Sequence, residues 1–75
     1  MKLPQISGLE LIKILHKFGF QVVRRKGSHV RLEKTSGTDM VKITVPMHNQ
    51  LKKGTLLQII KESNIPVEEW EKQFS

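Results

Sequence analysis

Apolar residues recur every three or four positions in the first part of the chain. This spacing predicts an amphipathic helix over about residues 8–18. Ser7 and Glu10 have the spacing of a capping box at its start, and Gly19 suits the left-handed backbone that often ends a helix. The chain is therefore expected to open with a well-defined helix.

Further along, the period of the pattern changes to two. Residues 20–26 are rich in β-forming types, and residues 29–34 and 40–45 alternate apolar and polar side chains. Turn-forming residues separate these segments at residues 27–28 and 35–39. Three strands joined by two short turns predict an antiparallel meander.

Alternation along these strands assigns the two faces of the predicted sheet. One face is expected to be buried and carries Val30, Leu32, Val41, Ile43 and Val45. The other is expected to face solvent and carries His29, Arg31, Glu33, Lys42 and Thr44. In the first strand Val22 and Val23 have opposite parity, so either face could take the arginines that follow. A bulge near Lys26 or Gly27 would resolve this ambiguity.

Two further helices are predicted after the strands. Residues 52–62 have a buried stripe of Leu56, Ile59 and Ile60. Pro66 can open a short last helix, whose apolar edge would be formed by Val67, Trp70 and Phe74. The order α-β-β-β-α with a short C-terminal helix predicts an α+β, two-layer fold with one open sheet face. With 75 residues, the chain is expected to form a single domain over residues 1–75.

Composition narrows the classes of function. The net charge of +6 favours a polyanionic partner such as nucleic acid. There is no cysteine, which excludes disulfides, zinc–thiolate sites and thiol nucleophiles. No metal-ligand spacing or phosphate loop is present, so no metal or cofactor is expected. No run approaches the roughly 20 apolar residues of a membrane span, which favours a cytoplasmic protein.

Basic residues cluster at two places that could bind a nucleic acid. The first is the extended run 23–34, and the second is the start of the helix at 52–62, where two lysines oppose the helix dipole unless a phosphate lies between them. The candidate nucleic-acid-binding residues are Arg24, Arg25, Lys26, Ser28, Arg31, Lys52 and Lys53. The Ser28 hydroxyl can contact a phosphate or simply form the turn. Because aromatic residues are few, contacts to phosphates and 2′-hydroxyls are expected rather than base stacking.

The chain resembles the HicA (YcfA-like) mRNA interferase toxins of toxin–antitoxin pairs over about residues 7–65. The resemblance rests on three motifs in order: Ser7-Gly8-Leu9-Glu10-Leu11-Ile12-Lys13 leading to Gly19-Phe20, then Lys26-Gly27-Ser28-His29, then Val45-Pro46-Met47-His48 followed by Lys52-Lys53-Gly54-Thr55-Leu56. It implies a double-stranded-RNA-binding-domain-like fold, RNA cleavage that arrests translation, and silencing by a HicB-like antitoxin. It also implies that the histidine of the Gly-Ser-His motif, here His29, is catalytic.

A histidine can cleave RNA without a metal by removing the proton of a 2′-hydroxyl, which then attacks the adjacent phosphorus. His29 is the candidate base, and the nearby cations can stabilise charge on the phosphoryl oxygens. The leaving 5′-oxygen also needs a proton, for which His48, Lys26 and water are the candidates; His48 could instead bind phosphate. Two other functions stay open, a non-catalytic RNA-binding domain and a protein-interaction domain that uses the open sheet face.

Overall fold

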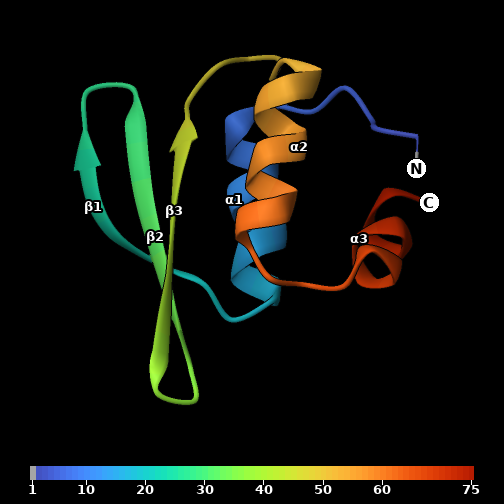
Figure 1. The fold of residues 1–75 in the computed structure, drawn as a ribbon. Helices are drawn as coiled ribbons and strands as arrows, with labels where there is room; N and C mark the ends of the chain where they lie inside the picture. The colour runs from blue at the N-terminus through green and yellow to red at the C-terminus, as the bar shows by residue number, and fades with distance from the viewer. Residues whose placement is uncertain (1) are drawn as a thin grey trace.

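The chain folds into one antiparallel sheet and three helices, in a computed structural model whose description covers residues 2–75 (Figure 1). The elements are α1 (Gly8–Lys17), β1 (Gln21–Lys26), β2 (His29–Ser36), β3 (Asp39–Pro46), α2 (Lys53–Glu62) and α3 (Val67–Phe74). The strand order is β1-β2-β3, and both neighbouring pairs are antiparallel. The predicted α+β fold with its three-stranded meander is confirmed.

The capping box at the start of α1 is confirmed. The Ser7 hydroxyl accepts a hydrogen bond from the Glu10 backbone N–H at 3.0 Å, and the Ser7 N–H donates to Glu10 Oε1 at 3.0 Å. The backbone and side-chain bonds from Ser7 lower the pKa of Glu10 from its ordinary value. At the other end of the helix, Gly19 has a φ of +98°, the left-handed conformation expected of a terminating glycine.

The Glu10 cap predicts a pH-dependent stability. Because its pKa is lower in the folded chain, the carboxylate stabilises the fold above its unfolded pKa, and this contribution is lost as the pH falls through the folded pKa. Glu10→Gln should therefore be less stable than the wild type near neutral pH, and the difference should shrink as the pH falls below the ordinary glutamate pKa of about 4.3. Urea denaturation at neutral and at acidic pH measures it, with the exposed Glu71→Gln as control. A difference independent of pH would contradict the assignment.

The bulge in β1 lies at Val23, and the predicted position near Lys26 or Gly27 is wrong. Val22 pairs with Leu32 and Arg24 pairs with Arg31, which leaves Val23 as the extra residue. The hairpin turn needs no bulge, because Gly27 has a φ of +57° and closes the turn directly between Lys26 and His29. The bulge resolves the parity of the strand, since Arg24 now lies on the face of Arg31.

The strands are also longer than predicted at two places. Residues 35–39 were expected to form a turn, but β2 continues to Ser36 and pairs with Asp39, leaving a two-residue turn. Gly37, with a φ of +63°, makes this tight turn possible. β3 also includes Pro46, which a strand end at the edge of a sheet tolerates.

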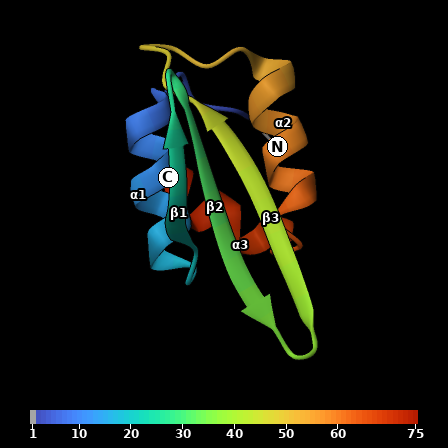
Figure 2. The same ribbon diagram turned by 90° about the vertical axis from the view of Figure 1, so that its left-hand side faces the viewer.

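The core lies between the inward face of the sheet and the two helices α1 and α2, while α3 packs on the far side of these helices (Figures 1 and 2). The predicted inward strand residues and the stripe of α2 are all buried. α3 is held by Trp70, which has no exposed surface and meets the Phe18 ring edge-on, with centroids 5.1 Å apart. Val67 was expected to join this edge but is 46% exposed, because α3 turns Trp70 and Phe74 inward instead.

None of the helices within residues 2–75 is both long enough and apolar enough to cross a membrane.

Candidate nucleic-acid interface

The outer face of the sheet carries an open hollow of about 240 Å³ beside the β1–β2 turn. Its lining consists of Arg24, Lys26, His29, Arg31 and Thr44. The strand register explains this gathering: Arg24 pairs with Arg31, Lys26 pairs with His29, and Thr44 continues the row from β3. Side chains of directly paired residues project to the same face, so β1, β2 and β3 all contribute to one site.

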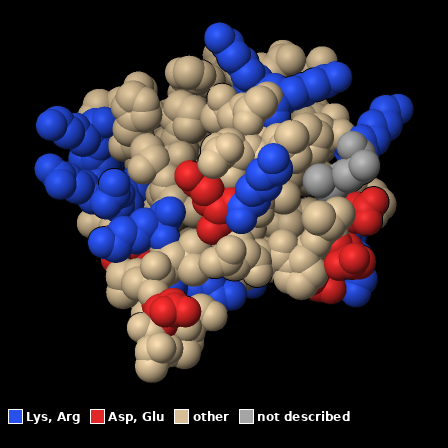
Figure 3. Space-filling view, viewed as in Figure 1, with Lys and Arg blue, Asp and Glu red and all other residues tan. Residues whose placement is uncertain are grey.

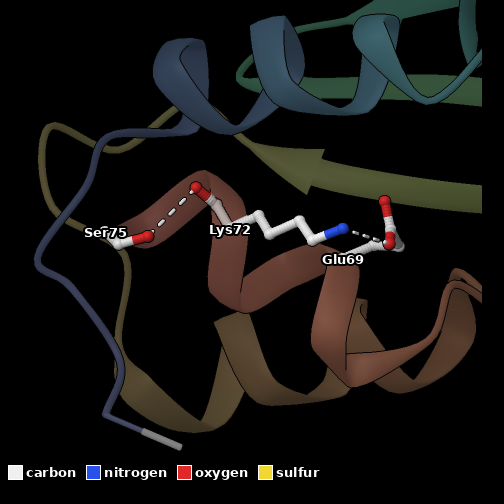
Figure 4. A network of polar contacts seen from close by, with 3 residues as sticks. All are labelled: Glu69, Lys72 and Ser75. Atoms are coloured by element: carbon white, nitrogen blue, oxygen red, sulfur yellow. Dashed lines mark hydrogen bonds and ion pairs between the residues drawn. The ribbon is translucent and has the colours of Figure 1, made fainter.

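Two of these cross-strand pairs place positive or potentially positive groups opposite each other. Arg24 faces Arg31, and Lys26 faces His29, an arrangement that weakens an antiparallel pair in the absence of an anion. No acidic side chain of the described chain forms an ion pair with them. The ion pair found within residues 2–75 joins Lys72 Nζ to Glu69 Oε2 at 3.3 Å on α3, where Ser75 also bonds to the backbone of Lys72 (Figure 4). A bound phosphate would relieve the repulsion in the hollow.

Charge is unevenly distributed over the surface. Lys and Arg side chains gather over the β1–β2 side of the molecule, and others project from the end where α2 begins (Figure 3). Acidic side chains gather over α3, on the opposite side (Figure 3). The sheet side therefore presents a positive potential to an approaching polyanion.

His29 is the first residue of β2 and is exposed. It lies between Lys26 on β1 and Pro46 on β3. No hydrogen bond of the described chain engages its ring, so both ring nitrogens can meet a ligand. His16 differs in this respect, because its Nδ1 lies 3.2 Å from the backbone oxygen of Phe20 at the end of α1. His29 is therefore the histidine that can act on a ligand in the hollow.

Backbone contacts fix the turn that precedes His29. The Met47 N–H donates to the Ser28 carbonyl at 2.6 Å, and the Gly8 N–H donates to the His48 carbonyl at 2.9 Å. A Cβ added to Gly8 would collide with the carbonyl oxygen of Pro46, so only glycine allows α1 to approach the loop this closely. The start of α1 thus holds the loop after β3, and that loop holds the β1–β2 turn.

The structure separates the remaining predicted site residues from the hollow. Arg25 pairs with the buried Val30 and lies on the other side of β1. His48 is exposed on the loop after β3 and does not line the hollow. Lys52 and Lys53 begin α2, where no side chain caps the helix. Ser28 lies in the turn itself, with its carbonyl bonded to Met47.

Thr44 lines the hollow although it was not predicted as a site residue. The alternation of β3 places it outward, and its pairing with Arg31 brings it into the lining of the hollow. The outward parity was therefore the only signal that could have identified it. Within residues 2–75, no three His, Asp or Glu side chains converge into a group that could hold a metal ion.

Residues 8–65 match the family model described as HicA toxin of bacterial toxin-antitoxin. The chain belongs to this family. No curated protein and no solved structure gives a match. Membership gives this HicA-family chain a toxin role within a toxin–antitoxin pair and implies an antitoxin as its partner. The matched region contains every residue that lines the hollow, whereas α3 lies beyond it.

Proposed function

We propose that this HicA-family toxin is an endoribonuclease that cleaves mRNA in the cytoplasm, arrests translation, and is silenced by a HicB-like antitoxin. The observation that carries the proposal is the hollow beside the β1–β2 turn. It combines one exposed histidine with three cations, and none of its lining residues is acidic. A histidine supplies the chemistry at a 2′-hydroxyl, and the cations supply affinity for the phosphates on either side.

His29 acts as the general base in this proposal. A ring nitrogen removes the proton of the 2′-hydroxyl, and the 2′-oxygen attacks the adjacent phosphorus as the bond from phosphorus to the 5′-oxygen breaks. The products are a 2′,3′-cyclic phosphate and, after protonation, a 5′-hydroxyl. Arg24 and Arg31 stabilise the charge that develops on the phosphoryl oxygens, because both line the hollow with His29.

The proton for the leaving 5′-oxygen is best assigned to Lys26. It pairs directly with His29 across the β1–β2 turn and shares the hollow with it. His48, the other candidate, lies outside the hollow on the loop after β3, and its backbone oxygen is bound to Gly8. We assign His48, together with Lys52 and Lys53, to RNA phosphates beyond the scissile one.

The lysines at the start of α2 provide a separate test of RNA binding. Lys52→Ala and Lys53→Ala should each weaken binding uniformly across RNA sequences and lower the slope of log K against log salt by roughly 0.7 to 1. The same changes should stabilise the fold slightly, by about 0.3–1 kcal/mol, since a cation opposes the dipole at a helix start. Salt titrations of RNA binding, with Lys72→Ala on α3 as control, measure the first effect. An unchanged slope would show that these lysines do not contact RNA phosphates.

A non-catalytic RNA-binding domain of the same fold is the second candidate. It is favoured by one observation: no group of the described chain orients the His29 ring by a hydrogen bond, whereas catalytic histidines are often held in this way. Expression of wild type and His29→Ala distinguishes the two functions. The proposed ribonuclease requires growth arrest by the wild type and normal growth with His29→Ala, while purified His29→Ala still binds RNA. Equal growth arrest by both proteins would favour the binding domain.

A further inference from the structure

β1 has a free outer edge, and the structure leaves it unusually open. It is the end strand in the order β1-β2-β3, and all six of its residues are exposed. β3, at the opposite edge, lies next to the helices and ends in a proline, whereas β1 stands farthest from the helical layer (Figures 1 and 2). The edge of β1 therefore presents unpaired backbone groups that another strand can use.

Two valines on this strand are about half exposed to solvent. Val22 and Val23 are 50% and 52% exposed, although their residue type favours burial. Val23 also lines a second hollow of about 480 Å³, together with the exposed Met40. Neither residue belongs to the hollow that contains His29. β1 thus combines an open edge with exposed apolar side chains, which is what strand addition requires.

The charge of β1 determines which partner this edge can accept. Arg24, Arg25 and Lys26 occupy its second half, and no ion pair within residues 2–75 involves them. A second copy of the chain, pairing edge to edge, would bring two clusters of three cations close together, and the repulsion between them disfavours this pairing. An acidic strand would instead face them with opposite charge. Arg25, which lies on the side away from His29, would then gain a partner as well.

We infer that an extended acidic segment of the antitoxin adds a fourth strand to the free edge of β1. Its backbone pairs with β1, its apolar side chains cover Val22 and Val23, and its carboxylates meet the cations at residues 24–26. This placement also brings negative charge to the rim of the His29 hollow, since Arg24 and Lys26 line it. The inference rests on the partner implied by family membership, and it holds whether or not the hollow cleaves RNA.

The experiment uses the full chain and a synthetic probe. The probe is an eight-residue peptide of four glutamates followed by four valines, which in the antiparallel direction can place glutamates beside residues 24–26 and valines beside Val22 and Val23. A peptide of four lysines followed by four serines is its control. Binding is followed by fluorescence anisotropy of the labelled peptide, and the pairing site by amide hydrogen exchange. Of the two peptides, we expect only the acidic one to bind. Its binding should slow amide hydrogen exchange in β1 and leave exchange at the start of α2 unchanged. The double variant Val22→Thr/Val23→Thr should bind about 2- to 30-fold more weakly.

Val67→Thr is the matched control, because Val67 is similarly exposed at 46% but lies on α3. It should bind the acidic peptide as the wild type does. Three results would overturn the inference: no saturable binding of the acidic peptide at low salt, protection outside β1, or equal affinity of the wild type and the Val22/Val23 double variant. Self-association of the free chain through β1, seen by sedimentation, would also overturn it. RNA cleavage by the same samples is measured separately, so that failure of the ribonuclease proposal can be distinguished from failure of this inference.

Discussion

Replacing His29 with alanine is expected to slow RNA cleavage by about 10²- to 10⁴-fold, the usual contribution of a general base. RNA binding should change little, because Arg24, Lys26 and Arg31 remain in the hollow. The fold should also be retained, since His29 is exposed and no bond of the described chain depends on its ring. Single-turnover cleavage of a defined RNA, beside a binding assay on the same preparation, measures both quantities.

The other two histidines serve as controls for this result. His16→Ala removes a histidine on α1, outside the hollow, and should leave the cleavage rate unchanged. His48→Ala should mainly weaken RNA binding, whereas Lys26→Ala should lower the cleavage rate itself, because Lys26 pairs with His29. A His29→Ala protein that cleaves at the wild-type rate would refute the assignment of the base.

Replacing Trp70 with alanine is expected to destabilise the protein by about 3–5 kcal/mol. A domain of this size has roughly 5–10 kcal/mol in total, so the variant should be close to unfolding. Trp70 is completely buried, packs edge-on against Phe18, and donates from Nε1 to the Ser63 hydroxyl at 3.1 Å. That hydroxyl also accepts from the Ile65 N–H and donates to the Ile60 carbonyl, so the tryptophan joins α3 to the end of α2.

Urea denaturation measures this effect, with two comparison variants. Trp70→Phe keeps an aromatic ring in the core but loses the bond to Ser63, so its loss of stability should be smaller than that of Trp70→Ala. Val67→Ala, on the exposed side of α3, should change stability by no more than about 0.5 kcal/mol. A Trp70→Ala protein as stable as the wild type would show that α3 contributes little to the stability of the fold. The expected result supports the proposal that residues 1–75 form a single domain.

The elements of the fold were predictable because local signals and periodicity agree. Ser7 and Glu10 mark a helix start that needs no tertiary contact, and Gly19 marks its end. The inward strand residues follow from alternation, because a slip of one residue would expose the whole apolar row. The outward position of His29 beside Arg31 follows from the same rule and is seen in the hollow.

Features that depend on contacts between strands and helices were harder to predict from the sequence. The bulge at Val23 reflects the register between two strands, and a sequence shows only that some irregularity is needed. The close approach of Gly8 to the loop after β3 could not be predicted. A side chain at this position would collide with the carbonyl of Pro46, which is far away in the sequence. The exclusion of Arg25 from the hollow likewise follows from pairing with Val30. Each of these features depends on how separate segments of the chain pack together, which the sequence does not show directly.

We propose that this toxin cuts RNA by attack of a 2′-hydroxyl, with His29 as the base. Cleavage of a defined RNA by the wild-type protein in excess chelator, with identification of the product ends, tests it most directly. We expect undiminished cleavage that yields a 2′,3′-cyclic phosphate and a 5′-hydroxyl, and no cleavage where the 2′-hydroxyl is replaced by hydrogen. Cleavage that stops with chelator, or that leaves a 5′-phosphate, would contradict it.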